Sequence, residues 1–239
     1  MTDSLPLRQA LQQKQAVVFD LFHTLTAIEL TSARNLSATH EILAVDKDTW
    51  NDVLRNTFRD RMRGLRRDSH ELLTDMARTV RPDIPAETVS RALELRIRRF
   101  ATALQEIPDK NIQVLRALRS QGKKLGLISN ADIMEVQSWP STQIPNLFDA
   151  VVFPCEVGHM KPEPRIYNIC LERLGVKAEN SASVGDGHFQ ELRGARALGF
   201  LTVMTTEIIS TLWPEAIEEI RKDADYVISD LRELSLQQT

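Results

Sequence analysis

The stretch Val17-Val18-Phe19-Asp20-Leu21-Phe22-His23-Thr24-Leu25-Thr26 is the part of the chain from which the fold can be inferred. An apolar run leads directly into the carboxylate of Asp20 and then into a turn, which is the pattern of a buried parallel strand ending at a polar group. The carboxyl end of such a strand faces the crevice in which open α/β sheets bind ligands, so Asp20 is a candidate nucleophile. The alternative from the local pattern is an aspartate that ends a strand and caps a turn.

Length and composition indicate a globular protein. The chain has 239 residues, of which 42% are hydrophobic, enough for one core and a smaller appended domain. A net charge of -3 gives no reason to expect nucleic acid as a partner, and no apolar run approaches the roughly 20 residues of a membrane span. Met1 to Gln15 lack the apolar stretch of a signal peptide, and Cys155 and Cys170 are too few for a disulfide scaffold. We therefore expect a cytoplasmic protein, a monomer or a homodimer, with both cysteines buried as packing residues.

After the first strand, residues 27–105 show helical patterns and no convincing strand. Asp48 is a candidate cap for one helix and Asp68 for a second. The clearest helix is expected after Pro85, because its apolar residues recur three and four positions apart. These residues are Val89, Leu93, Ile97, Phe100, Ala101 and Leu104. The pattern predicts an all-helical insertion.

The predicted insertion is rich in arginine. It holds 14 Lys plus Arg against 12 Asp plus Glu, a net charge of +2, so the remainder of the chain carries -5. A cationic lid over an anionic core would suit a small anionic substrate. The plainer interpretation, which we favour, is a solvated helix face from which one or two arginines reach the site.

Strand patterns return after the insertion. They are expected at 124–130, 150–153, 181–184, 200–204 and 226–228. A helix opened by Pro108 and Asp109 precedes the first of them and is followed by Gly122, and later helices are expected to end near Gly175 and Gly199. Strands that alternate with helices predict a doubly wound parallel α/β sheet covered on both faces.

Polar residues follow several of these strands. Ser129 and Asn130 end the strand after the insertion and could donate hydrogen bonds to substrate oxygens. Lys161 lies just before a helix marked by prolines, where it could neutralise a phosphoryl or carboxylate group, although a solvent-facing lysine is the ordinary case. Asp186 and Glu191 flank a flexible turn after the strand at 181–184, and their oxygens could bind Mg²⁺.

In chain order, these pieces resemble the four motifs of the haloacid dehalogenase (HAD) superfamily: Asp20 with Thr24, then Ser129, then Lys161, then Asp186 with Glu191. The combination is far more specific than any one piece. The resemblance implies a catalytic set in which Asp20 is the nucleophile and Ser129 and Lys161 hold the transferred group. The helical insertion resembles the cap of the family, which implies a core formed by residues 1–26 and 106–239 and a cap formed by residues 27–105.

The resemblance also implies a Mg²⁺ site. Its ligands would be Asp20, the backbone carbonyl of Phe22 and Asp186, while Glu191, where the family usually has aspartate, would orient the metal-bound waters. Phe22 itself departs from the family pattern, because phosphatases carry their general acid, a second aspartate, at this position. An aromatic residue here resembles the 2-haloacid dehalogenases, which use no metal.

Three functions follow from these features. Asp186 and Glu191 favour Mg²⁺-dependent hydrolysis of a small phosphorylated substrate, the reading that we prefer. Phe22 favours metal-independent, dehalogenase-like hydrolysis at carbon, or else a catalytically impaired binding protein. If the reaction is at phosphorus, His23 and His188 are candidates for the missing proton donor, although a structural role is the plainer interpretation of each.

Overall fold

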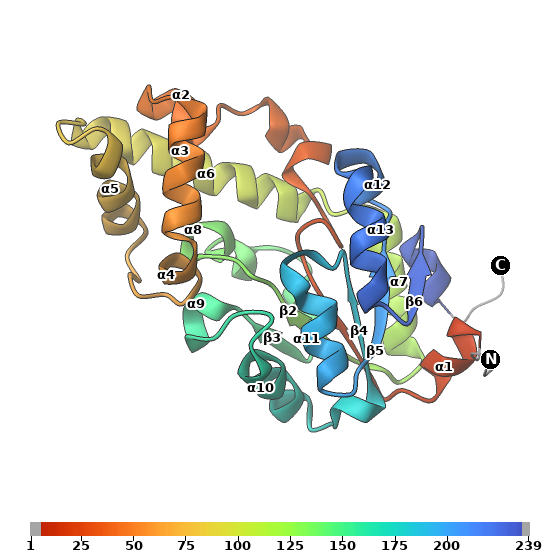
Figure 1. Ribbon diagram of the computed structural model, residues 1–239. Helices are drawn as coiled ribbons and strands as arrows, with labels where there is room; N and C mark the ends of the chain where they lie inside the picture. Colours follow the sequence, from red (N-terminus) through yellow and green to blue (C-terminus); the bar gives the residue numbers. More distant parts are fainter. Residues whose placement is uncertain (1–5, 236–239) are drawn as a thin grey trace.

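Figure 1 shows the computed structural model of the chain, which describes residues 6–235. The core is a six-stranded sheet in the order β3-β2-β1-β4-β5-β6, and every neighbouring pair is parallel. The strands are β1 (Ala16–Phe19), β2 (Lys124–Ile128), β3 (Ala150–Val152), β4 (Ser181–Gly185), β5 (Leu201–Thr205) and β6 (Tyr226–Ile228). The doubly wound parallel sheet predicted from the sequence is therefore confirmed. The outermost parts of the predicted core, residues 1–5 and 236–239, lie outside the described residues.

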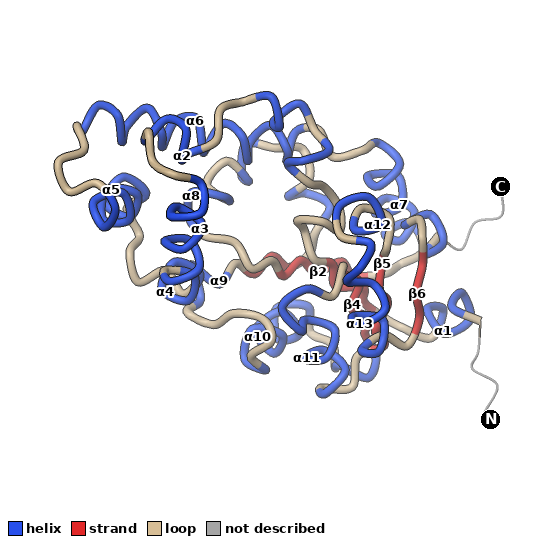
Figure 2. Tube along the Cα trace, turned by 45° about the horizontal axis from the view of Figure 1, so that its top comes forward, coloured by secondary structure: helices blue, strands red, loops and turns tan. Residues whose placement is uncertain are grey.

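One set of helices covers both sides of the sheet, and a second set forms most of residues 27–105 (Figure 2). They are α1 (Leu7–Gln12), α2 (Thr39–Leu43), α3 (Lys47–Asn56), α4 (Phe58–Met62), α5 (Ser69–Val80), α6 (Ala86–Gln105), α7 (Asp109–Ser120), α8 (Ile133–Val136), α9 (Pro154–Val157), α10 (Pro164–Leu174), α11 (Glu191–Ala197), α12 (Ile209–Leu212) and α13 (Ile217–Ile220). Short 3-10 helices fill many of the connections. None of the helices within residues 6–235 combines the length and the apolar character needed to cross a bilayer.

Strand β1 lies inside the sheet and is buried on both faces. Val17 and Phe19 belong to the apolar cluster that also contains Leu115 of α7, whereas Val18 belongs to the cluster that contains Tyr167 of α10. Side chains alternate between the faces of a strand, so a strand covered on both sides needs an unbroken apolar sequence. This requirement explains the apolar run that precedes Asp20.

Residues 27–105 contain helices and turns, without a strand, as predicted. Most of one apolar cluster lies in this segment, including Trp50, Leu73 and Val89, and Met134 of α8 completes it. Figure 1 shows α2, α3, α5 and α6 together at the end of the molecule away from the two termini. The two ends of the insertion meet, because the Thr26 hydroxyl donates a buried hydrogen bond of 2.7 Å to the backbone oxygen of Ala103. The division of the chain into cap and core remains a prediction.

The helix caps agree with the sequence with one exception. Asp68 caps α5 by accepting a hydrogen bond of 2.8 Å from the backbone of Glu71, and α6 begins directly after Pro85, both as predicted. The cap predicted at Asp48 is wrong, because Asp46 caps α3 through the Thr49 amide at 2.8 Å. The backbone of Asp46 is extended, as a capping residue requires, while Asp48 already lies in the first helical turn.

The predicted helix ends and the cysteines also agree with the structure. Gly175 ends α10 with a φ of +64° and Gly122 follows α7 with a φ of +78°, a region that glycine occupies without strain. Cys155 and Cys170 are buried free thiols, and burial raises the pKa of each to about 12. They are packing residues, as expected.

Candidate active site

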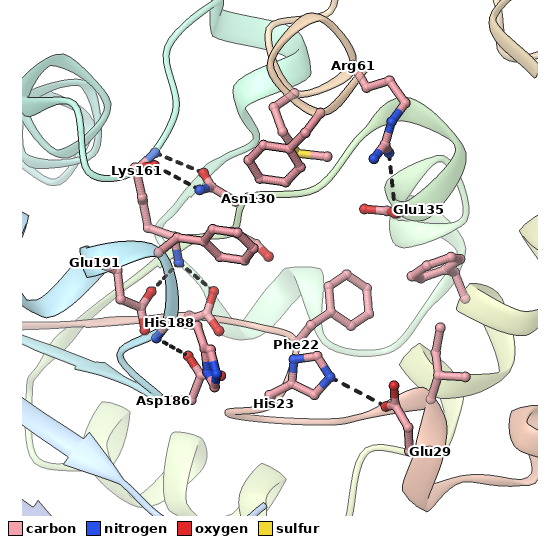
Figure 3. A pocket seen from close by; sticks show the side chains of 17 residues that line it. Phe22, His23, Glu29, Arg61, Asn130, Glu135, Lys161, Asp186, His188 and Glu191 are labelled. Carbon is pink, nitrogen blue, oxygen red and sulfur yellow. Dashed lines mark hydrogen bonds and ion pairs between the residues drawn. The ribbon is translucent and has the colours of Figure 1, made fainter. Parts of the chain in front are cut away.

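The polar residues predicted to carry the chemistry meet at the carboxyl end of the sheet. Asp20 directly follows β1, Ser129 directly follows β2 and Asp186 directly follows β4. These three strands are neighbours, and the order of the sheet reverses beside β1, which is where open α/β sheets form a ligand crevice. A cavity of about 250 Å³ lies there, lined by side chains from the sheet and from the helical insertion (Figure 3).

Lys161 lies at the centre of this cluster and is only 4% exposed. Its ammonium group donates hydrogen bonds to Asp20 Oδ1 at 2.5 Å, to the Ile128 backbone oxygen at 2.9 Å and to the carboxylate of Glu191. Burial alone would lower the pKa of this lysine, but the two carboxylates outweigh burial and raise it. The sequence left open whether Lys161 faces the site or the solvent, and the structure shows that it faces the site.

Asn130 holds the backbone of Lys161 in place. Its side-chain amide donates to the Lys161 backbone oxygen at 2.9 Å, and its side-chain oxygen accepts from the Lys161 backbone N–H at 2.8 Å. Both polar atoms of the Asn130 side chain are therefore engaged with the protein. Asn130 lines the cavity, and its direct contact with substrate remains a prediction.

Asp20, Asp186 and Glu191 form a buried group of carboxylates whose ligand oxygens lie within 4.8 Å of one another. Lys161 can neutralise only one of the three charges. Burial raises the pKa of Glu191 to about 8 and also raises that of Asp20, with the neighbouring carboxylates adding to the effect. A hard divalent cation prefers such oxygen ligands and would neutralise the excess charge, so the residues fit a Mg²⁺ ion.

The position of Glu191 depends on the glycines around it. A Cβ atom at Gly185 would lie 1.9 Å from Glu191 Oε1, so the missing side chain makes room for the carboxylate. The Gly187 backbone N–H donates to the same oxygen at 2.9 Å, and the Tyr167 hydroxyl donates to the Glu191 backbone oxygen at 2.8 Å. These contacts explain how a side chain longer than aspartate fits at this position.

Both candidate histidines lie at the cavity, and each has an acidic neighbour. His188 Nδ1 lies 2.8 Å from Asp186 Oδ2, and His23 Nε2 lies 3.4 Å from Glu29 Oε2. Burial would lower the pKa of His23, but the hydrogen bond to Glu29 and the charges of Glu29, Asp186 and Asp20 together outweigh burial and raise that pKa. Burial would raise the pKa of Asp186, but its side-chain and backbone hydrogen bonds with His188 and the charges of His188 and His23 together outweigh burial and lower that pKa. The rings of both histidines pack edge-on against Trp213, with centroids 4.7 and 5.1 Å from it.

Two buried hydroxyls lack a hydrogen-bond partner among the described residues, those of Ser129 and Thr24. Ser129 lines the cavity, so its hydroxyl is available to a bound substrate. Thr24 is fully buried and lies outside the residues that line the cavity. Their catalytic roles remain predictions.

Phe22 directs an apolar ring at the cavity in the place where the second aspartate would lie. The ring packs edge-on against Phe100 of α6, with centroids 5.4 Å apart and planes at 79°. Both rings line the cavity. Binding of a metal ion by the backbone carbonyl of Phe22 remains a prediction.

Sequence reasoning missed a buried network of two arginines and two acids beside the cavity. Arg61 of α4 pairs with Asp132, and Arg96 Nη2 lies 2.6 Å from Glu135 Oε1. Arg61 and Glu135 line the cavity on the side opposite to Asp186 (Figure 3). Burial raises the pKa of Glu135 to about 7, with the Asp132 charge adding to the effect. The sequence holds one signal for the two acids of this network. Asp132 followed three residues later by Glu135 is the pattern of a capping box, and Asp132 does cap α8.

Residues 14–199 match the family model of the haloacid dehalogenase-like hydrolases. The chain belongs to this family. It is therefore a hydrolase of the HAD type, as the motifs predicted.

Curated relatives include two phosphatases. A segment of 122 residues is 31% identical to the glyceraldehyde 3-phosphate phosphatase of Methanothermobacter thermautotrophicus and covers 49% of this chain and 53% of that protein. A segment of 123 residues is 31% identical to the phosphoserine phosphatase of Thermus thermophilus and covers 51% and 47%. The chain spans about half the length of these relatives.

Solved structures of HAD proteins share the fold. A HAD phosphatase from Thermococcus onnurineus has a TM-score of 0.59 and 24% identity, over 92% of this chain and 95% of that one. The 2-haloacid dehalogenase from Pseudomonas syringae has a TM-score of 0.64 and 20% identity, over 92% and 96%. Because both phosphatases and dehalogenases adopt this fold, the fold does not choose between the two reactions.

Proposed function

We propose that this HAD hydrolase cleaves a small phosphate monoester with Asp20 as nucleophile and Mg²⁺ as cofactor. The observation that carries the proposal is the buried cluster of Asp20, Asp186 and Glu191 around Lys161. Its three carboxylates exceed the charge of one lysine, and a metal ion would supply the difference. The phosphatases among the curated relatives support hydrolysis at phosphorus.

In the proposed reaction, a carboxylate oxygen of Asp20 attacks phosphorus and displaces the leaving group, and water then hydrolyses the resulting acyl phosphate. Lys161, now hydrogen-bonded to Asp20, and the unpartnered hydroxyl of Ser129 would hold the phosphoryl oxygens. Asn130 would act by positioning Lys161. Asp20, Asp186 and the Phe22 carbonyl would hold Mg²⁺, Glu191 would orient its waters, and the ion would supply positive charge beside the phosphoryl group.

We propose further that residues 27–105 form a cap over a core made of residues 1–26 and 106–239. The insertion contributes Arg61, Phe58 and Phe100 to the wall of the cavity, while Asp20 and Lys161 come from the other part of the chain. This arrangement would let the cap select the substrate and the core perform the chemistry. A cytoplasmic location and a homodimer stay predictions from the sequence.

Metal-independent hydrolysis at carbon is the second candidate, because Phe22 removes the general acid that an alkoxide leaving group would need, whereas a halide needs none. An assay of phosphate monoesters and 2-haloacids, each with Mg²⁺ and with EDTA, separates the two. We expect release of phosphate that depends on Mg²⁺. Release of halide at the same rate in EDTA, without any release of phosphate, would establish the second candidate instead.

A further inference from the structure

The wall of the cavity away from the carboxylates is largely apolar. It consists of Phe22, Ile28, Phe58, Met62, Phe100 and Phe189. Four of the eight phenylalanines of the chain therefore gather at one cavity, and they come from four separate segments. A ligand group that binds against this wall would therefore contact mainly aromatic side chains.

The four rings form two pairs. Phe22 and Phe100 pack edge to face, while Phe58 of α4 stacks on Phe189 with centroids 5.0 Å apart and planes at 16°. Phe189 is 60% exposed and has a φ of +55°, so it is an exposed aromatic residue on a strained backbone. Packing in the core does not explain a phenylalanine at this exposed position, whereas contact with a ligand at the cavity does.

The charged side chains on this part of the wall have partners within the protein. Arg61 pairs with Asp132, Glu135 with Arg96, and His23 with Glu29. Each arginine of the buried network thus lies against an acid of the protein rather than facing the cavity alone. A bound group on this side therefore meets aromatic rings and neutralised ion pairs, which favours an uncharged group over a carboxylate or an amine.

Phe22 adds a chemical requirement. Without a carboxylic acid at this position, the leaving group must depart with little help from a proton donor. A phenol has a pKa of about 10, as the tyrosine side chain does, whereas that of water is about 15.7 and an alcohol resembles water. A phenolate is thus a far better leaving group than an alkoxide.

From these observations together, we propose that the substrate is an aryl phosphate monoester, with its phosphoryl group at Asp20 and its ring against Phe22, Phe58, Phe100 and Phe189. This inference rests on the proposed phosphatase function. The size of the cavity agrees, since a cavity of about 150 Å³ holds benzene and the one here measures about 250 Å³. The ring contacts would set specificity, and the low pKa of the phenol leaving group would make a proton donor unnecessary.

The first test compares kcat/KM in Mg²⁺ for phenyl phosphate, benzyl phosphate and glycerol 3-phosphate. Benzyl phosphate carries the ring but leaves as an alkoxide, so it separates recognition of the ring from the quality of the leaving group. We expect phenyl phosphate to be the best substrate and benzyl phosphate to have the lower KM of the other two. A kcat/KM for glycerol 3-phosphate equal to that of phenyl phosphate would overturn the inference and leave the phosphatase function standing.

The second test changes the wall. Phe58→Ala and Phe189→Ala should each raise KM for phenyl phosphate about tenfold and change KM for glycerol 3-phosphate much less. Leu65→Ala is the matched control, because Leu65 is also an apolar residue of the insertion, is 67% exposed and lies outside the cavity. Melting curves confirm that each variant is folded. Equal changes in KM for both substrates would contradict a specific role for the rings.

Binding separates the two proposals. Calorimetry with phenylphosphonate and methylphosphonate, which have no ester bond to cleave, measures recognition without turnover, and we expect phenylphosphonate to bind about tenfold more tightly. If no phosphate ester is cleaved and this preference is nevertheless found, the phosphatase function fails while recognition of the ring stands. Equal affinities for the two phosphonates would overturn the aryl inference even in an active phosphatase.

Discussion

At the scale of single residues, the dominant feature is that Lys161 lies among more negative charge than it can neutralise. The three carboxylates around it are buried, and the pKa values of Asp20 and Glu191 are raised by that burial. Removing one of these charges should therefore relieve repulsion rather than leave an unpaired cation, since Lys161 keeps its second carboxylate partner.

The substitution Asp20→Asn tests the nucleophile. Asparagine keeps the size of the side chain but removes the attacking charge, so turnover should fall by about a thousandfold or more while the melting temperature stays near that of the wild type. Steady-state assays and thermal melts check the two parts. Asp60→Asn, at an exposed acid of α4, serves as the control for general effects of lost charge. A folded Asp20→Asn variant with most of its activity would place the chemistry elsewhere.

At the scale of elements, the turn between β4 and α11 is built around a contact that no local sequence pattern reveals. Gly185 lies against the carboxylate of Glu191, where a Cβ atom would approach Oε1 to 1.9 Å. Gly185→Ala should therefore displace that carboxylate and lower both activity and affinity for Mg²⁺, by about tenfold or more.

Shortening the displaced side chain tests this explanation. Adding Glu191→Asp to Gly185→Ala removes one methylene and makes room for the new methyl group, so the double variant should recover activity relative to Gly185→Ala alone. The measurement is kcat/KM in a double-mutant cycle. If the losses of kcat/KM in the two single variants simply add in the double variant, the contact between Gly185 and Glu191 is not the cause of the lost activity.

The buried network of α4, α6 and α8 should make stability depend on pH. Burial raises the pKa of Glu135 from 4.5 to about 7, so the folded protein keeps a proton that the unfolded chain has already released in that range. The free energy of unfolding should therefore fall as pH rises from about 4.5 to about 7, by up to about 3 kcal/mol. Glu135→Gln, which cannot ionise, should lose this part of the slope in urea titrations at several pH values. Parallel curves for the two proteins would contradict the raised pKa.

At the scale of the whole molecule, the sheet could be predicted and the contacts of the insertion could not. The apolar run before Asp20 and the returning strands are local patterns, and the rule that parallel strands align their carboxyl ends brings Asp20 and Asp186 together. The stack of Phe58 on Phe189 and the pairing of Arg61 with Asp132 depend on how distant helices are oriented. No periodicity in either segment encodes that orientation.

Binding of Mg²⁺ should stabilise the whole fold. An ion that binds the folded protein at 100 times its Kd adds about 2.7 kcal/mol to the free energy of unfolding, so the melting temperature should rise with Mg²⁺ and fall back with EDTA. Asp186→Asn removes one carboxylate and should abolish most of that rise, while Asp223→Asn, at a surface ion pair with Arg193, should keep it. The same rise in all three proteins would show that the ion acts elsewhere.

The hydrogen bond from Thr26 to the backbone oxygen of Ala103 closes the insertion upon itself, across 77 positions of sequence. The partners of the Lys161 ammonium, by contrast, all lie outside residues 27–105. To the sheet, the insertion is therefore a loop whose entry and exit are held together, at Thr26 with Ala103 and also at Ser32 with Glu106. A segment of different length or sequence between this entry and exit would leave the nucleophile in place. Proteins that descend from one ancestral sheet could therefore acquire new substrates by exchanging the insertion while keeping the same reaction.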